Sequence, residues 1–215
     1  MSELPGHIGR LAVFPLPGAL LFPGMALPLH IFEPRYRAMV SEAMARDRLI
    51  GMIQPRTSAR TGGGDPAPLF DVGCVGRMVD IEALDDGRYN IVLAGVARFD
   101  VVRELDVPTS FRQVEARLWD EAEEKEGLAP VERAALEGAA RAFADAQGYA
   151  VDWDMVGKLD DHSLVNGVAQ IAPFDAAAKQ ALLEIRGLAN RSELLIQLME
   201  FFGRRDGDEN RVTLQ

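Results

Sequence analysis

The chain has 215 residues, which allows one large domain or two small ones, each able to bury a core. Hydrophobic residues make up 48% and charged residues 26%, the usual balance of a soluble globular protein. The formal net charge of -10, with only three lysines, repels phosphate backbones, so we expect no nucleic acid among the partners.

The cysteine content and the apolar runs of the chain indicate the cellular compartment in which the protein is found. Cys74 is the only cysteine, so neither an intrachain disulfide nor a thiolate metal cluster can form. Residues 1–10 show no signal-peptide pattern, and proline or glycine interrupts every long apolar run. We therefore expect a cytoplasmic protein with no membrane partner.

The first quarter of the chain predicts two short strands and a helix. Leu11–Leu16 and Met25–Phe32 are apolar strand candidates, separated by two Pro-Gly turn signals around Leu20–Phe22. Pro28 lacks an N–H group, which confines the second strand to a sheet edge or a bulge. Pro34 suits the first position of a helix. The apolar face of that helix comprises Tyr36, Met39, Val40, Ala43 and Met44.

Further strands are predicted up to residue 119. Residues 55–68 have no periodicity and read as a mobile surface loop, whose three glycines lack the Gly-Lys-Ser/Thr of a phosphate loop. Asp85-Asp86-Gly87 is a hairpin turn, and Gly95 is expected to end a strand. Strand candidates are 49–54, 72–82, 89–93, 99–105 and 111–119. So many short strands indicate a small barrel or a strongly twisted sheet.

The composition changes at an acidic stretch, 120–126, and helices follow. Asp175 is expected to cap a helix, and Asn190 with Glu193 to form a capping box at the start of the last one. The helix from Pro130 is predicted to bury a stripe of apolar side chains, namely Val131, Ala135, Ala139, Ala142, Phe143 and Ala146. The last helix is predicted to bury a second stripe, namely Leu194, Leu195, Leu198, Met199, Phe201 and Phe202. We predict a β-rich domain over 1–119, a helical domain over 120–205 and a disordered tail over 206–215.

Four blocks carry a resemblance to a known family, in the right order along the chain. They are Val13-Phe-Pro-Leu-Pro-Gly with Leu21-Phe-Pro-Gly-Met-Ala-Leu-Pro-Leu, then His30-Ile-Phe-Glu-Pro-Arg-Tyr-Arg, then Val72-Gly-Cys-Val-Gly-Arg with Asp86 to Phe99, and finally Ala172-Pro-Phe-Asp to Glu193-Leu-Leu. This order resembles the substrate-binding domain of the ATP-dependent Lon proteases, a bacterial-type domain that also occurs free-standing.

The resemblance implies a fold and a function. The fold class is α+β, with an N-terminal β-rich, PUA-like pseudo-barrel followed by a C-terminal α-helical bundle. In Lon proteases the domain helps to recognise unfolded or degron-bearing polypeptides and to organise the hexamer. The chain lacks the Gly-x-x-x-x-Gly-Lys-Ser/Thr of the ATPase motor. We therefore expect a polypeptide-binding module without enzyme activity or cofactors, whose partners are such polypeptides and, in some settings, a separate protease or ATPase.

Residues capable of catalysis or metal binding have simpler interpretations. His7, His30 and His162 are far apart and lack metal-ligand spacing, so no metal site is predicted. Cys74 lies between valines in a predicted strand, which favours a small buried hydrophobe over a nucleophile. Lys158 and Ser163 lack the context of a Lon-type Ser-Lys dyad. No catalytic residue is predicted.

The apolar segment 20–36 is the strongest candidate for binding. Its prolines remove backbone donors, so it cannot form a regular central strand, and side chains that do not fill the core can line a surface groove. Leu69 and Phe70 can extend that groove. The candidate polypeptide-binding residues are Phe22, Met25, Leu27, His30, Phe32, Tyr36, Leu69 and Phe70.

Two other functions stay open at this point. The wide stripe of the last helix suits an adaptor or oligomerisation module that docks on a partner. A small-molecule-binding protein or a hydrolase of PUA-like fold is the third hypothesis, because barrels host varied sites.

Overall fold

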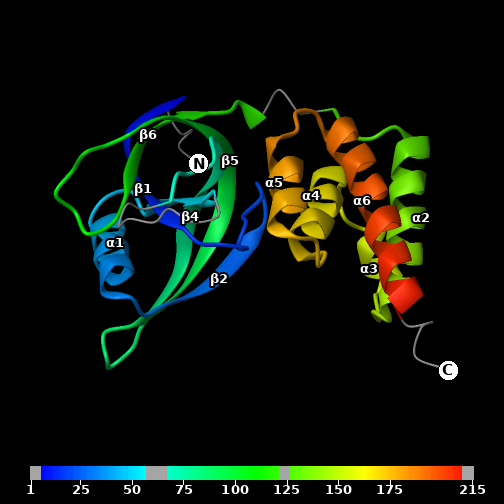
Figure 1. Cartoon of the computed structure of the whole chain (residues 1–215), viewed down its shortest axis with the longest axis horizontal. Helices are drawn as coiled ribbons and strands as arrows, with labels where there is room; N and C mark the ends of the chain where they lie inside the picture. The colour runs from blue at the N-terminus through cyan, green and yellow to red at the C-terminus, as the bar shows by residue number, and fades with distance from the viewer. Residues whose placement is uncertain (1–5, 57–66, 122–125, 210–215) are drawn as a thin grey trace. The chain divides into compact units, whose positions relative to one another are not determined.

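The chain folds into two compact units, a β-rich one at Met1–Glu121 and a helical one at Ala122–Gln215 (Figure 1). The structure is a computed structural model that describes residues 6–56, 67–121 and 126–209, with side chains up to residue 203. The fold class is α+β, as predicted. The core of the predicted loop (57–66), most of the acidic stretch (122–125) and the end of the predicted tail (210–215) lie outside the described residues.

Five strands of the first unit pair into a closed ring. They are β1 (His7–Pro15), β3 (Leu49–Ile53), β4 (Val72–Ala83), β5 (Tyr89–Glu104) and β6 (Gln113–Leu118). The ring runs β5-β4-β3-β1-β6 and returns to β5. β1 and β3 are parallel, whereas the other pairs are antiparallel. Such closure leaves no free edge between these strands, as expected for a pseudo-barrel.

β5 joins two predicted strands into one, so the prediction that Gly95 ends a strand is wrong. The first half of β5 pairs with β2 (Ala26–Ile31) and the second half with β6, while β4 pairs along both halves. The register between β4 and β5 shifts beside Gly95. A Cβ at Gly95 would lie 2.1 Å from the Phe22 carbonyl oxygen. The glycine is needed for this close backbone approach and does not interrupt the strand.

The ring encloses an apolar core to which all five strands contribute. Its buried members are Leu11, Val13, Leu49, Ile53, Val75, Phe99, Val114 and Ala116. The Phe99 ring fills space that only a glycine leaves open, because a Cβ at Gly73 would lie 2.6 Å from that ring and 2.5 Å from the Met52 carbonyl oxygen. The interior is therefore close-packed around one large aromatic side chain.

β2 and α1 (Pro34–Met44) flank the ring. In the described part of the chain β2 pairs with β5 alone, which confirms the edge position predicted from Pro28. α1 begins at Pro34 as predicted and buries Tyr36, Met39, Val40 and Ala43, whereas Met44 is 36% exposed. The three residues Leu20–Phe22 are buried against the sheet.

The second unit consists of helices. They are α2 (Pro130–Gln147), α3 (Trp153–Val156), α4 (Asp161–Ile171), α5 (Ala176–Glu184) and α6 (Leu188–Glu209). α2 and α6 run side by side in Figure 1 and pack along their length. The Asp175 carboxylate accepts a hydrogen bond from the Ala178 N–H at 2.8 Å, which confirms the predicted cap of α5. The short helix α3 was not predicted.

Two sequence-based details of the helical unit are wrong. Val131 of the predicted α2 stripe is 75% exposed, and the buried side chains are Leu136, Ala140, Phe143 and Ala144. Alanines occur on every face of this helix, so they carry little periodic signal, and Leu136 and Phe143 decide which face is buried. α6 begins at Leu188 instead of after Asn190, whose amide donates to the Arg186 carbonyl at 3.0 Å.

A buried arginine organises the helical unit. Arg191 is 1% exposed and donates to the carbonyl oxygens of Leu182 and Ile185 at the end of α5, both at 3.2 Å. It also donates to the Asn166 Oδ1 of α4 at 3.2 Å. Because the last carbonyls of a helix lack intrahelical partners, this side chain satisfies the end of α5 and ties it to α4 and α6.

Candidate functional site

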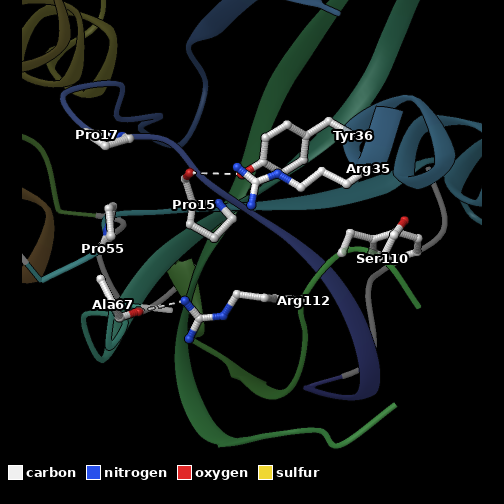
Figure 2. Close-up of a pocket in the computed structure, with 9 residues that line it drawn as sticks. Pro15, Pro17, Arg35, Tyr36, Pro55, Ala67, Ser110 and Arg112 are labelled. Atoms are coloured by element: carbon white, nitrogen blue, oxygen red, sulfur yellow. Dashed lines mark hydrogen bonds between the residues drawn. The ribbon is translucent and has the colours of Figure 1, made fainter. Parts of the chain in front are cut away.

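A cavity of about 270 Å³ opens in the β-rich unit (Figure 2). Most of its wall is apolar, supplied by prolines, an alanine and two aromatic rings, and two arginines carry the charge. The lining residues are Pro15, Pro17, Arg35, Tyr36, Pro55, Ala67, Ser110, Phe111 and Arg112. Prolines have no backbone N–H, so this part of the wall offers a rigid surface without main-chain donors.

Parallel pairing of β1 and β3 places the prolines together. Pro15 ends β1 and pairs with Ile53, two residues before Pro55. The buried side chain of Gln54 then fixes the turn that contains Pro17. Its Oε1 accepts from the Gly18 N–H at 2.8 Å, and its Nε2 donates to the carbonyls of Leu16 at 2.8 Å and Ala19 at 2.6 Å. The sequence signals for this arrangement are the Pro17-Gly18 pair and the glutamine at the end of an apolar strand.

Two guanidinium groups extend into the cavity. Arg112 donates through Nε and Nη2 to the Glu104 carboxylate at 2.6 and 2.5 Å, and through Nη1 to the Ala67 carbonyl at 2.7 Å. Arg35 lies over the Tyr36 ring, with its Cζ 4.5 Å from the ring centroid, and pairs with Glu33 at 2.9 Å. Figure 2 shows both guanidinium groups reaching toward the side where Pro15, Pro55 and Ala67 lie.

Tyr36 forms the floor where α1 meets β1. Its ring is tilted against Phe14, with 4.2 Å between the ring centroids, and its hydroxyl donates a long hydrogen bond of 3.5 Å to the Pro15 carbonyl. Burial raises the pKa of Tyr36, an effect that the positive charges of Arg35 and Arg112 oppose. The phenol therefore stays neutral at physiological pH.

The predicted binding residues occupy several places. Phe32 is 61% exposed and stacks on His30 with ring centroids 6.2 Å apart, while His30 Nδ1 lies 2.7 Å from Asn90 Oδ1. Tyr36 lines the cavity. Met25 and Leu27 are half-buried, Met25 just before β2 and Leu27 within it.

Three predicted residues belong neither to the cavity lining nor to the His30–Phe32 pair. Phe22 is completely buried, because the backbone approach at Gly95 holds it in the core. Leu69 packs against the core of the ring, and Phe70 lies under the Arg56 guanidinium, whose Cζ is 4.6 Å from the ring centroid. The structure therefore does not join the eight residues into one groove.

The β2–α1 junction, residues 30–36, links the exposed aromatic ring to the cavity. Phe32 precedes Arg35 by three residues, and three residues of extended chain span at most about 11 Å. Apart from Tyr36, the lining residues were missed by sequence reasoning. Pro17 was predicted in a turn, Pro15 in a strand and Pro55 in a loop, and only the parallel register of β1 and β3 brings them together.

Other chemically capable side chains are engaged elsewhere. Cys74 is completely buried, and burial raises the pKa of its thiol far above the usual range. The Ser163 hydroxyl donates to the Asp160 carboxylate at 2.7 Å, and Lys158 Nζ lies 3.8 Å from Met155 Sδ. Among the described side chains, which cover 6–56, 67–121 and 126–203, no cluster of three His, Cys, Asp or Glu residues has metal-binding geometry. No helix within those ranges is long and apolar enough to cross a membrane.

Comparison with known proteins identifies the family. The model of the LON substrate-binding domain, described for the ATP-dependent protease La (LON), matches residues 10–200. The chain belongs to this family, which confirms the resemblance seen in its sequence. Lon protease 2 of Myxococcus xanthus is 32% identical over 104 residues, which are 46% of this chain and 12% of that protein. The Lon protease of Brucella suis biovar 1 is 26% identical over 210 residues, 93% of this chain and 25% of that protein.

Solved structures share the fold. A Lon N-terminal domain protein from Xanthomonas campestris superposes with a TM-score of 0.66 at 22% identity, covering 88% of this chain and 98% of that one. The N-terminal domain of a Mycobacterium avium complex Lon protease gives 0.66 at 18% identity, covering 89% and 98%. This chain spans only about a quarter of the length of the Brucella protease.

Proposed function

We propose that this chain is a non-catalytic polypeptide-binding domain that acts in the cytoplasm on unfolded or degron-bearing chains through the β2–α1 junction. One observation carries the proposal: Phe32, a large aromatic side chain, is 61% exposed and precedes by three residues Arg35, which lines an apolar cavity. Exposed aromatic rings next to pockets are typical of interaction surfaces. Membership of a substrate-binding family supports the same function.

Side chains, more than backbone pairing, are expected to make the contacts. An extended peptide can add a strand to an exposed sheet edge, and β2 is such an edge. Pro28 in the middle of β2 cannot donate a hydrogen bond, however, and a proline on an edge opposes continuous strand addition. The Phe32 ring and the cavity wall remain available for apolar side chains of a client.

A chemically unfolded protein provides the test. Reduced and alkylated lactalbumin should bind the native chain in calorimetry, and Phe32→Ser should weaken binding about fivefold or more, as expected for a large aromatic side chain at an interface. Val102→Ser is the matched control, because Val102 is 49% exposed at the far end of β5. Absence of binding by the folded wild type would refute the proposal.

A further inference from the structure

We propose that the cavity selects a polypeptide segment in which an apolar side chain lies next to an Asp or Glu side chain. The apolar group would enter the space between Pro15 and Phe111, and the carboxylate would meet Arg35 and Arg112. The inference rests on the proposed function, since it names the class of polypeptide bound at the same surface. The cavity would then bind an apolar side chain and a carboxylate together, and not apolar side chains in general.

The size of the cavity favours a side chain as the occupant. Its volume of about 270 Å³ lies below the range of roughly 300–1,000 Å³ in which drug-sized ligands and cofactors bind. Rigid proline and aromatic walls bind a single apolar group well, because they lose little conformational entropy on binding. Phe32 lies a few residues along the chain from Arg35 and would contact the neighbouring part of the same segment.

The two arginines in the cavity lining favour a carboxylate next to the apolar side chain. Both charged groups among the described lining residues are arginines, whereas their partners Glu33 and Glu104 are not part of the wall. Three of the five N–H groups of Arg112 are used within the described residues, so two remain for a ligand. Because each guanidinium already pairs with a glutamate, the site offers a ligand carboxylate its remaining N–H donors, which form charge-assisted hydrogen bonds.

The wall favours an acidic side chain over a terminal carboxylate. Chain-terminal carboxylates are captured by nests of backbone N–H groups, and Pro15, Pro17 and Pro55 have none to offer. Arginine clusters are instead the usual means of recognising acidic motifs. The two sources of carboxylate can be separated by experiment.

Short labelled peptides in a Gly-Ser background test the selection by fluorescence anisotropy. A central Phe-Glu pair should bind the wild-type chain best. Changing the pair to Phe-Gln should weaken binding about fivefold, because one charge-assisted contact is lost. Changing it to Ala-Glu should weaken binding by about the same factor, because one buried ring is lost. A peptide ending in Phe with a free carboxylate should bind no better than its amide. Tighter binding of the free acid would overturn the acidic side-chain assignment.

Protein variants locate the binding. Arg35→Gln should abolish the preference for Phe-Glu over Phe-Gln, because it removes one of the two guanidinium groups at the cavity. Arg35 is half-exposed, so we expect the variant to fold normally. Ser110→Trp, at an exposed rim position, should block the Phe-dependent part of binding. The control Arg117→Gln removes the same charge from a β6 residue outside the lining and should leave the preference unchanged.

The outcomes separate this inference from the proposed function. If unfolded lactalbumin binds in a Phe32-dependent manner but Arg35→Gln and Ser110→Trp change nothing, the proposed function stands and the cavity assignment is wrong. If neither lactalbumin nor any peptide binds the folded chain, both are wrong. Loss of the Phe-Glu preference in Arg35→Gln, with lactalbumin binding retained, supports both.

Discussion

The interiors of the two units of the chain are stabilised by different interactions. The β-rich unit closes a ring around an apolar core, in which a phenylalanine ring packs closely over a glycine. Each unit also buries an arginine: Arg98 of the β-rich unit pairs with the Glu121 carboxylate at 2.8 Å, whereas Arg191 of the helical unit donates to backbone carbonyls at the open end of a helix. Close packing over Gly73 and the donors of Arg191 are therefore different sources of stability, and substitutions at the two positions should destabilise different units.

The two apolar segments that the sequence analysis considered as binding surfaces differ in how regularly they are buried. The regular stripe of α6 packs inside its own unit, where Leu195 is fully buried and Met199 is 2% exposed, although Phe201 is 56% exposed. The proline-broken segment 20–36 cannot repeat one pattern, so it buries Phe22 and exposes Phe32. An irregular backbone thus creates the surface on which the proposed function rests, and the α6 stripe lends little support to an oligomerisation module.

Each unit contains one of the two tryptophans, which makes the comparison measurable. Trp119 lies in the first unit and Trp153 in the second, each with an arginine Cζ 4.4 Å from its ring centroid. In a Trp153→Phe background, fluorescence reports the β-rich unit, and in a Trp119→Phe background it reports the helical unit. Denaturant unfolding of these two backgrounds is the assay for the predictions that follow.

Gly73→Ala should have the largest effect. The added Cβ would lie 2.5 Å from the Met52 carbonyl oxygen, and backbone at that distance has to move. We expect a loss of about 3 kcal/mol or more in the free energy of unfolding of the β-rich unit, at the upper end for overpacking. The control Gly9→Ala, where an added Cβ meets no described atom within 4 Å, should change it by less than about 0.5 kcal/mol. Equal effects of the two would show that the Phe99 packing does not limit stability.

Arg191→Met should come next and act on the helical unit. It leaves the Leu182 and Ile185 carbonyls without this buried donor, which should cost about 2–3 kcal/mol in that unit. Arg191→Lys retains the charge but not the planar set of donors, so an intermediate loss is expected. If methionine proves neutral, the buried network is not what holds α5 to α6.

Asp175→Ala removes the N-cap of α5 and should destabilise the helical unit by about 1 kcal/mol. Asp175→Asn keeps an oxygen acceptor and should be close to wild type in the same unfolding experiment. A cost for asparagine equal to that for alanine would point to the charge of Asp175, not its hydrogen bond, as the stabilising feature.

The smallest effect concerns the acid stability of the helical unit. Hydrogen bonds from the Ser163 hydroxyl and backbone N–H hold the pKa of Asp160 below its usual range. A carboxyl group whose pKa is lower in the folded state stabilises the fold above its unfolded pKa of about 3.9, and this contribution disappears as the pH falls through the folded value. Asp160→Asn keeps the cap and does not titrate. Its unfolding free energy should therefore fall less than that of wild type between pH 6 and 3, and parallel curves would exclude the effect.

Local rules predicted much of the molecule. Pro34 starts α1, Asp175 caps α5, and the Asp-Gly pair at 86–87 forms the β4–β5 hairpin, because capping and turn chemistry depend on near neighbours. The errors arose where partners are distant in sequence. Gly95 reads locally as a break, yet Phe22 requires it inside a continuous strand. The buried face of the alanine-rich helix α2 could not be predicted from its pattern, because Leu136 and Phe143 determine it by packing inside the helical unit.

For the candidate site, the sequence by itself determined the family and the irregular segment 20–36, because ordered motifs and prolines are visible in one dimension. It also identified Phe32 and Tyr36 as residues of interest. Only the tertiary structure decided that Tyr36 meets Pro15, Pro55 and Arg112 around one cavity and that Phe22 is unavailable. The physical reason is that β1 pairs with β3 and with β6, and these long-range pairings bring together residues up to about a hundred positions apart.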